Sequence, residues 1–319
     1  MVKLMNKLKP CIHGKIDTEE VDLYLTLAVY NFGFWFNGVN GFIVLDDVEP
    51  IVAEVSISGD YTIYFLSGNC SKEHITRLEW SLGIKEDLTL FHELGIKDLL
   101  LGEFIRKYRG WRPRSSSLWW ALVIGVCQQN ASFIQGWRML YNIIKLYNRR
   151  VLVGKTEVLL PPTPSDVVNN KALLINAGTG YRANTIYNVA KVFAKKELDQ
   201  EAIVKSSSPI IEDKLKGIKG IGSYTARLSI ILAFRKYDLP PIDRWLRKII
   251  SIVYGVPLGD AERIWRDKWG RWSGLAALAT TIALDAKPLS KALERIKNKQ
   301  LVPMDKDKPT PLNLWKFYK

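Results

Sequence analysis

The sequence predicts an α+β protein, with an antiparallel β-sheet domain at the N-terminus followed by a mostly α-helical core. Apolar and polar residues alternate between about residues 20 and 67, and apolar residues recur at helical spacing along most of the remaining chain. We expect a β-rich domain with flanking helices at 1–112, a helical domain at 113–292 and a charged tail at 293–319. The sequence contains no internal repeat.

The N-terminal strands are indicated by alternation and by the turns between them. Residues 42–45 and 62–66 are rich in β-branched and aromatic residues, and Asn, Gly and Asp separate such runs. From Lys72 to Tyr108 the apolar residues are spaced as in helices. We therefore expect a sheet followed by helices within the first domain.

The helical domain begins after a short linker. Residues 113–117 read Pro-Arg-Ser-Ser-Ser, and a serine hydroxyl can accept a hydrogen bond from an unpaired N–H group of the helix that follows. From Lys297 on, charged residues and prolines predict a surface tail. The predicted helices lie at about 118–127, 131–147, 166–175, 181–196, 209–216, 223–235, 243–254, 259–269 and 272–284.

The composition favours a nucleic-acid partner and argues against a metal centre. Lys and Arg total 46 against 32 Asp and Glu, and this net charge of +14 favours a polyanion through counterion release. Charge alone is also compatible with a basic protein that binds no specific polyanion. The odd, widely spaced Cys11, Cys70 and Cys127 argue against a disulfide framework and cannot supply four thiolates to zinc or an iron–sulfur cluster. With only three histidines, we expect no metal site.

The sequence also predicts that the protein does not enter a membrane. No apolar run reaches the roughly 18–20 uncharged residues of a membrane span. Residues 1–5 lack the apolar block of a signal peptide. We expect a cytoplasmic protein.

Residues 214–226 predict two helices joined by a glycine turn. Gly220 and Gly222 let the backbone turn tightly, and the N–H groups that open the second helix form a seat for a phosphate. Three lysines between 214 and 219 add positive charge. The alternative is a simple helix corner in which glycine is only a C-cap.

Asp243 follows Pro240, Pro241 and Ile242, and it lies 19 positions after Tyr224. This combination resembles the helix-hairpin-helix DNA glycosylase superfamily, whose GxG hairpin is followed by a hydrophobic residue and an obligatory Asp. The resemblance implies a two-lobed glycosylase core and a catalytic pair of Asp243 and Tyr224. It also implies a DNA-binding hairpin that comprises Lys219, Gly220, Ile221, Gly222 and Ser223.

Three further segments match the superfamily in order, so the resemblance covers most of the chain. Residues 22–27, with Trp35, resemble the first strand of the N-terminal domain of 8-oxoguanine DNA glycosylase. Cys127-Gln-Gln-Asn130 lies where the superfamily presents Gln or Asn to the duplex, and Gly180-Tyr-Arg-Ala183 matches a glycosylase segment whose aromatic residue wedges beside the lesion. The missing cluster cysteines select the 8-oxoguanine and 3-methyladenine glycosylase II branch.

The resemblance gives these segments roles in opening the duplex. A glycosylase everts its target nucleotide and fills the gap that is left. The duplex wedge and partner-base contacts would be Gln128, Gln129, Tyr181 and Arg182. The alternatives are a polar helix end for the two glutamines, a core aromatic for Tyr181 and a solvated charge for Arg182.

The chemistry implied for the pair is hydrolysis of an N-glycosidic bond. The carboxylate of Asp243 would stabilise positive charge on the sugar and orient or deprotonate the attacking water, and as an N-cap it would stay ionised. Superfamily members that also cut the strand carry Lys in place of Tyr224, and a phenol cannot form a Schiff base. We therefore expect a monofunctional enzyme, with Lys219 or Lys248 as alternative amines.

The substrate is indicated less sharply. Where the 8-oxoguanine enzymes carry Gln and Phe on the last barrel helix, this chain aligns Ala277 and Thr281, and it has Tyr30 and Phe133 in place of a Gly and an Arg. An aromatic pocket would suit alkylated purines through cation–π attraction, although tryptophans at such spacing also form cores. The expected base pocket comprises Tyr30, Trp35, Trp245, Trp272, Ala277 and Thr281.

We thus expect a monomeric, nucleoid-associated glycosylase that removes alkylated or deaminated bases from double-stranded DNA. Its expected cofactors are none, or a monovalent cation bound by carbonyls of the hairpin. One alternative is an 8-oxoguanine DNA glycosylase with or without lyase activity. Another is a non-catalytic helix-hairpin-helix DNA-binding protein.

Overall fold

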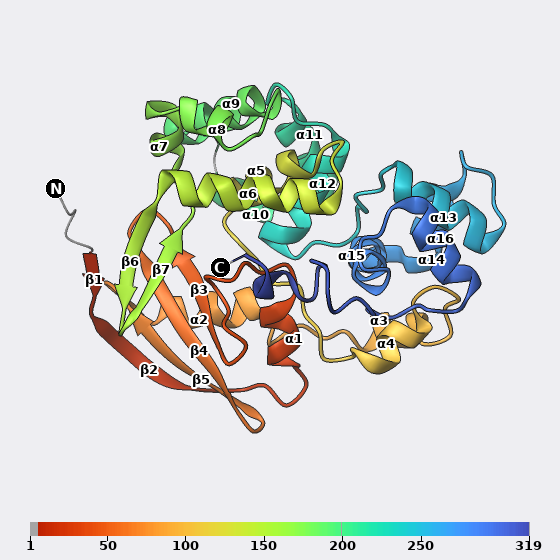
Figure 1. Ribbon diagram of the computed structural model, residues 1–319, viewed down its shortest axis with the longest axis horizontal. Helices are drawn as coiled ribbons and strands as arrows, with labels where there is room; N and C mark the ends of the chain where they lie inside the picture. Colours follow the sequence, from red (N-terminus) through yellow and green to blue (C-terminus); the bar gives the residue numbers. More distant parts are fainter. Residues whose placement is uncertain (1–5, 199, 319) are drawn as a thin grey trace.

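A computed structural model describes residues 6–198 and 200–318 and shows an N-terminal sheet beside two groups of helices (Figure 1). The sheet is antiparallel, in the order β2-β5-β4-β3. Its core face packs against Leu27, Leu78 and Leu82 of the two adjoining helices. These elements are β2 (Pro10–Asp17), α1 (Leu23–Ala28), β3 (Asn40–Asp46), β4 (Ile51–Ser58), β5 (Tyr61–Ser67) and α2 (Glu73–Leu82).

Helix α1 corrects the expectation of a strand at 22–27. The Asp22 side chain caps the helix by accepting a hydrogen bond from the Leu25 N–H at 2.8 Å. Leu23 and Leu27 pack in the sheet cluster, whereas Leu25 packs in the core of the distal helices. A helix buried on opposite sides carries apolar residues that alternate as in a strand, and this explains the wrong prediction.

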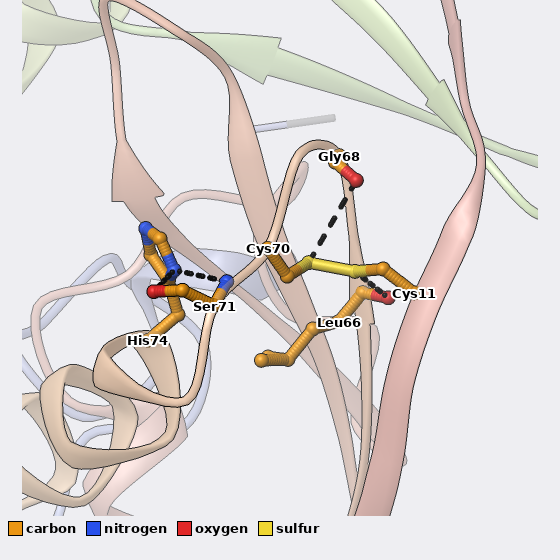
Figure 2. The surroundings of a disulfide bond; sticks show 6 residues. All are labelled: Cys11, Leu66, Gly68, Cys70, Ser71 and His74. Carbon is orange, nitrogen blue, oxygen red and sulfur yellow. Dashed lines mark hydrogen bonds between the residues drawn. A yellow bond between two sulfur atoms is a disulfide. The ribbon is translucent and has the colours of Figure 1, made fainter.

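A disulfide between Cys11 and Cys70 corrects the expectation of unpaired cysteines (Figure 2). The start of β2 pairs with the end of β5 through Pro10 and Ser67, so residues 59 positions apart come together with their Cα atoms 6.0 Å apart. The third cysteine, Cys127, is free and buried. An odd number of cysteines does not exclude one bridge that fastens an edge strand.

The helices form a central group and a distal group with separate hydrophobic cores. The prediction that Ser117 begins the helical domain's first helix is confirmed, because its hydroxyl accepts from the Trp120 N–H. The central helices are α5 (Leu118–Gln128), α6 (Phe133–Tyr147), α7 (Pro164–Asn169), α8 (Ala172–Asn176), α9 (Arg182–Ala194), α10 (Gln200–Lys205), α11 (Ser208–Lys216) and α12 (Ser223–Phe234). The distal group has α3 (Thr89–Gly95), α4 (Gly102–Lys107), α13 (Arg244–Tyr254), α14 (Ala261–Trp269), α15 (Ser273–Ala283), α16 (Leu289–Lys297) and the short 3₁₀ turn Gly270–Trp272.

Two details of the helical region differ from the prediction. The single helix expected at 166–175 is interrupted at Asn170, whose non-helical backbone (φ −141°, ψ 66°) ends α7 before α8 begins. A hairpin of β6 (Arg149–Val153) and β7 (Thr156–Leu160) follows α6, and β6 pairs in parallel with β1 (Asn6–Leu8). The buried Val151, Val153 and Val158 hold this hairpin against the central core.

The C-terminal segment is not the solvated surface tail that its charges predicted. It runs from the distal helices back to the N-terminal domain and ends in a 3₁₀ turn at Leu314–Lys316 (Figure 1). The Tyr30 N–H donates to the Pro311 carbonyl at 2.7 Å, and the Leu314 side chain is fully buried. The segment therefore fixes the loop that follows α1.

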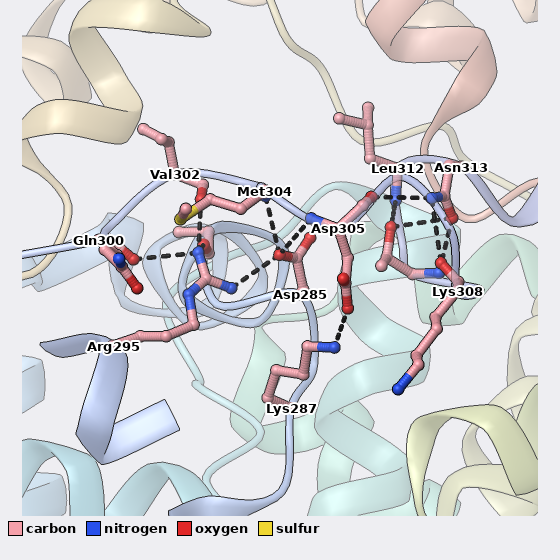
Figure 3. A network of polar contacts seen from close by, with 12 residues as sticks. Asp285, Lys287, Arg295, Gln300, Val302, Met304, Asp305, Lys308, Leu312 and Asn313 are labelled. Atoms are coloured by element: carbon pink, nitrogen blue, oxygen red, sulfur yellow. Dashed lines mark hydrogen bonds and ion pairs between the residues drawn. The ribbon is translucent and has the colours of Figure 1, made fainter. Parts of the chain in front are cut away.

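Several charged groups at the start of this segment are paired within the chain (Figure 3). The Arg295 guanidinium donates to the Asp285 carboxylate at 2.7 Å, and the Met304 N–H donates to the same carboxylate at 2.8 Å. Lys287 pairs with Asp305. Basic residues that find acids and carbonyls within the chain do not need solvent, which is the physical reason for the wrong prediction.

Candidate active site

The glycine turn forms the helix-hairpin-helix that the sequence predicts. Helix α11 ends at Lys216 and α12 begins after Gly222. Gly220 has a φ of +99°, and a Cβ at this position would overlap the Thr185 side chain, so glycine is required twice over. Gly222 faces open space and no side chain caps the N–H groups that open α12. These N–H groups can therefore bind an external anion.

Positive charge surrounds this turn. The side chains of Lys214, Lys216 and Lys219 are exposed, and only Lys216 forms an ion pair among the described residues, with Asp213 at 3.5 Å. The hairpin carbonyls of Gly220 and Lys219 accept hydrogen bonds from the side-chain amides of Gln129 and Asn188. Two carbonyls of the hairpin, where a monovalent cation was expected, thus each accept one hydrogen bond within the protein.

Asp243 is the N-cap of α13, as expected. Its Oδ1 accepts from the Leu246 N–H at 2.8 Å. Asp243 is exposed as a residue, but the protein around its carboxyl raises the pKa of the group above the usual value, and the backbone N–H groups of Leu246 and Trp245 only partly offset this. The expectation that capping alone keeps the group ionised was therefore incomplete, because desolvation acts against it.

The negative charge of Asp243 affects the pKa of Tyr224. Burial raises the pKa of the Tyr224 phenol, and the Asp243 carboxylate raises it further. The pKa of Tyr30 is raised mainly by burial and, to a smaller extent, by the charge of Tyr224. The three residues come from α13, α12 and the loop after α1, so they bring the central group, the distal group and the N-terminal domain together.

A cavity of about 160 Å³ opens beside Tyr224. A space of roughly 150 Å³ accommodates one benzene ring, so the cavity is of the right order for an aromatic base. Its wall is mainly aromatic and aliphatic, with a few polar groups. The residues that line it include Val29, Tyr30, Trp35, Arg114, Trp120, Gln128, Phe133, Trp137, Tyr224, Leu228 and Thr281.

The structure brings half of the expected base pocket to this cavity. Tyr30, Trp35 and Thr281 line it. Trp272 and Ala277 instead lie in the distal core, where Trp272 stacks on Tyr237, and the Trp245 indole donates to the Lys287 carbonyl at 2.8 Å. Of the two α15 positions that the resemblance aligned with the pocket, Thr281 lines the cavity and Ala277 lies in the core.

The two glutamines at the end of α5 differ in their surroundings. Gln128 lies on the cavity wall against Gly136, and its buried Nε2 has no hydrogen-bond partner. Gln129 donates to the Gly220 carbonyl at 3.1 Å and to the Thr225 hydroxyl at 2.7 Å. Gln129 therefore supports the hairpin in this structure and does not reach outward to a partner base.

Tyr181 and Arg182 lie at the start of α9. The Tyr181 ring is 59% exposed, as a side chain that inserts into DNA must be. The Arg182 guanidinium lies over this ring, 4.6 Å from its centroid, and donates to the carbonyls of Gln129 and Asn130. Arg182 thus holds the end of α5 in this structure.

Sequence reasoning missed an ion-pair network behind the site. Arg227 of α12 pairs with Glu212 of α11 at 3.0 Å and with Glu262 of α14 at 2.7 Å. Glu262 also pairs with Arg247 of α13 at 3.2 Å. The network joins the hairpin to the helix that Asp243 caps, and the i,i+3 and i,i+4 patterns used for helices do not reveal such contacts between separate elements.

Metal binding and membrane spanning are two further questions for residues 6–198 and 200–318. No group of three or more His, Cys, Asp or Glu in these ranges could hold a metal ion. No helix within them has the length and apolar character needed to cross a bilayer. The expectation about residues 1–5 lies outside the described residues.

Comparisons with known proteins place the fold. No family model matches the chain. The chain is 28% identical over 174 residues to the DNA-3-methyladenine glycosylase of Bacillus subtilis (strain 168), a match that covers 52% of this chain and 55% of the relative, so it spans about half of that protein's length.

Solved structures match almost the whole chain. The 3-methyladenine DNA glycosylase of Archaeoglobus fulgidus superposes with a TM-score of 0.69 and 20% identity over 84% of this chain and 98% of that one. The Clostridium acetobutylicum 8-oxoguanine glycosylase/lyase, bound to duplex DNA with cytosine opposite 8-oxoguanine, gives 0.67 and 16% over 92% and 99%. Together with the hairpin geometry, these similarities show that this chain has the helix-hairpin-helix DNA glycosylase fold.

Proposed function

We propose that the protein is a DNA glycosylase that hydrolyses the N-glycosidic bond of a damaged, everted base. The observation that carries this proposal is the electrostatic influence of Asp243 on Tyr224, a residue of the aromatic cavity wall, next to a hairpin whose helix N–H groups no described side chain caps. The names of the similar proteins, DNA-3-methyladenine glycosylase and 8-oxoguanine glycosylase/lyase, support the same reaction class.

Asp243 is proposed as the catalytic carboxylate. Positive charge develops on the sugar as the base leaves, and a carboxylate in a partly dehydrated site stabilises that charge more strongly than one in bulk water. The same group can orient or deprotonate the attacking water. The helix N–H groups that hold the carboxylate keep it fixed before the reaction begins.

Release of the base is proposed to leave the strand uncut. A lyase step needs an amine that can reach C1′, and no lysine is among the residues described around the cavity. Lys219 lies in the exposed hairpin turn and Lys248 is exposed on α13. The Tyr224 phenol, with its raised pKa, stays protonated at neutral pH and cannot form an imine.

The proposed partner is double-stranded DNA. The N–H groups of α12 and the exposed lysines would bind phosphates, and Tyr181 would fill the space left by the everted base. The Gln128 amide could reach a partner base only by leaving the cavity wall. The reaction as proposed uses no cofactor, and a monomeric, cytoplasmic and nucleoid-associated protein remains part of the proposal.

A panel of duplex oligonucleotides with one lesion each tests this function. Hypoxanthine, uracil, 8-oxoguanine, 1-methyladenine and a 3-methyladenine analogue are incubated with the protein, and the strands are separated with and without alkali. Breaks only after alkali support a monofunctional glycosylase, whereas breaks without alkali indicate a lyase. Release of no base from any duplex, with DNA binding intact, would favour a non-catalytic DNA-binding protein.

A further inference from the structure

Arg114 is a partly buried cation on the cavity wall, and it forms no ion pair with a described carboxylate. Its Nη2 donates to the carbonyls of Val29 at 3.2 Å and Tyr30 at 3.3 Å. Its Nε is buried and has no hydrogen-bond partner, and no bond of Nη1 to a described residue is found. Nε and Nη1 of this planar donor group therefore have no hydrogen-bond partner among the described residues.

The other enclosed arginines of the chain differ in this respect. Arg235 pairs with Glu86 at 2.6 Å, and Arg295 pairs with Asp285 at 2.7 Å. Arg112, which also reaches the cavity, has Glu86 as a favourable charge nearby. Burial lowers the pKa of Arg114 to about 10 without a neighbouring charge to offset it, so at neutral pH the side chain is still a cation.

The acids nearest along the wall are engaged elsewhere. Arg114 also borders a second cavity, of about 430 Å³, which Asp46 and Asp47 line. Asp46 forms an ion pair with Arg77 at 3.8 Å, and Asp47 accepts a hydrogen bond from the Ser117 hydroxyl at 3.1 Å. Among the described residues, no carboxylate lies within ion-pair distance of Arg114. A buried charge without a partner is costly, and a bound ligand that accepts hydrogen bonds would relieve the cost.

We propose that Arg114 is a specificity-determining residue that donates hydrogen bonds to a carbonyl oxygen or ring nitrogen of the everted base, and so selects uncharged deaminated or oxidised bases over cationic alkylated bases. This inference rests on the proposed function. Hypoxanthine, uracil and 8-oxoguanine are uncharged and present such acceptors, and the unpartnered Gln128 Nε2 supplies a further donor on the same wall.

A cationic base would be attracted by the aromatic rings of the cavity and repelled by Arg114. The rings of Trp35, Trp120 and Trp137 would attract a cation. A guanidinium enclosed in the same small cavity repels it, however, because two like charges interact strongly where water is excluded. We expect the repulsion to prevail, since Arg114 has no carboxylate to neutralise it.

Single-turnover rates on duplexes with hypoxanthine or 1-methyladenine test the inference, because 1-methyladenine carries a positive charge at neutral pH. The wild type is expected to release hypoxanthine at least about tenfold faster, the factor that corresponds to a difference of 1.4 kcal/mol. Arg114→Gln should reduce this ratio by about tenfold or more, chiefly by sparing or raising the 1-methyladenine rate. Arg114→Lys keeps the charge and should keep the discrimination against 1-methyladenine.

Three outcomes overturn parts of the proposal separately. If Arg114 only holds the Tyr30 loop, both variants will slow the two substrates by the same factor and leave the ratio unchanged, which refutes the inference alone. A wild type that prefers 1-methyladenine refutes it as well. A wild type that releases no base from these two duplexes or from any other duplex of the panel refutes the proposed function, and the inference with it. Arg263→Gln, which removes an exposed arginine of α14, is the matched control and should change neither rate.

Discussion

The hairpin region and the C-terminal segment are both rich in basic residues, but they differ in how far acids of the same chain pair with those residues. Lys214 and Lys219 of the hairpin region project into solvent and have no ion pair among the described residues. At the start of the C-terminal segment, the buried Arg295 pairs with Asp285, and Lys287 pairs with Asp305. The difference teaches that the density of charge along a sequence does not reveal where it points. What matters is whether acids and free carbonyls of the same chain lie close enough to pair with the basic residues.

The largest expected effect separates chemistry from binding in the hairpin region. Asp243→Asn should reduce the rate of base release by roughly 10²–10⁴-fold, because the amide cannot stabilise the sugar cation or activate water. Binding to lesion-containing DNA, measured by fluorescence anisotropy, should stay within a few-fold of wild type. Asp213→Asn at the exposed end of α11 is the control. Undiminished release by Asp243→Asn would refute the role of this carboxylate.

The next effect concerns stability of the C-terminal segment. Asp285→Asn leaves the buried Arg295 without its counterion, and breaking a buried pair in this way costs about 3–5 kcal/mol. Chemical denaturation should show a lower free energy of unfolding for this variant, whereas Glu294→Gln, which removes an exposed pair with Lys291, should change it by less than about 1 kcal/mol. Equal effects of the two substitutions would mean that the segment behaves as a solvated tail after all.

A smaller effect compares one lysine from each region. Lys219→Gln should weaken DNA binding and reduce the slope of log affinity against log salt by about 1, as expected for the loss of one phosphate contact. Lys297→Gln at the end of α16 removes the same charge from an exposed site of the other region, and its salt slope should equal that of wild type. If both lysines change the slope equally, DNA binding depends on net charge and not on the hairpin.

The smallest effect is the pH dependence of base release. Because burial raises the pKa of Asp243, the carboxyl should take up its proton at a higher pH than an ordinary aspartate. The single-turnover rate should therefore rise with pH through a value above about 3.9 and be level near neutrality, where the group is ionised. An acid limb at or below about 3.9 would show that the partial desolvation of this carboxyl has no kinetic consequence.

The sequence predicted the helical region well because local rules decide it. The Ser117 cap and the glycine hairpin depend on residues a few positions apart, and they lie where expected. The prolines before Asp243 and the helical pattern after it likewise predicted that this residue lies at the start of α13.

The failures all involve contacts between distant segments. Cys11 meets Cys70 only through the pairing of β2 with β5, and Leu314 is buried only because the chain returns to α1. Trp272 resembled a pocket residue until its partner Tyr237, from another segment, placed it in the distal core. Arg114 was read as part of a linker, since nothing near it in the sequence indicates a cavity wall.

The central claim is that an everted base enters the cavity beside Tyr224 with its sugar next to Asp243. A structure of Asp243→Asn bound to a duplex with one hypoxanthine tests this most directly. We predict that the base lies between the aromatic walls within hydrogen-bond distance of Arg114, with C1′ facing the amide that replaces the carboxylate. A base that stays stacked in the duplex, or one that is everted into any other part of the protein, would contradict the account.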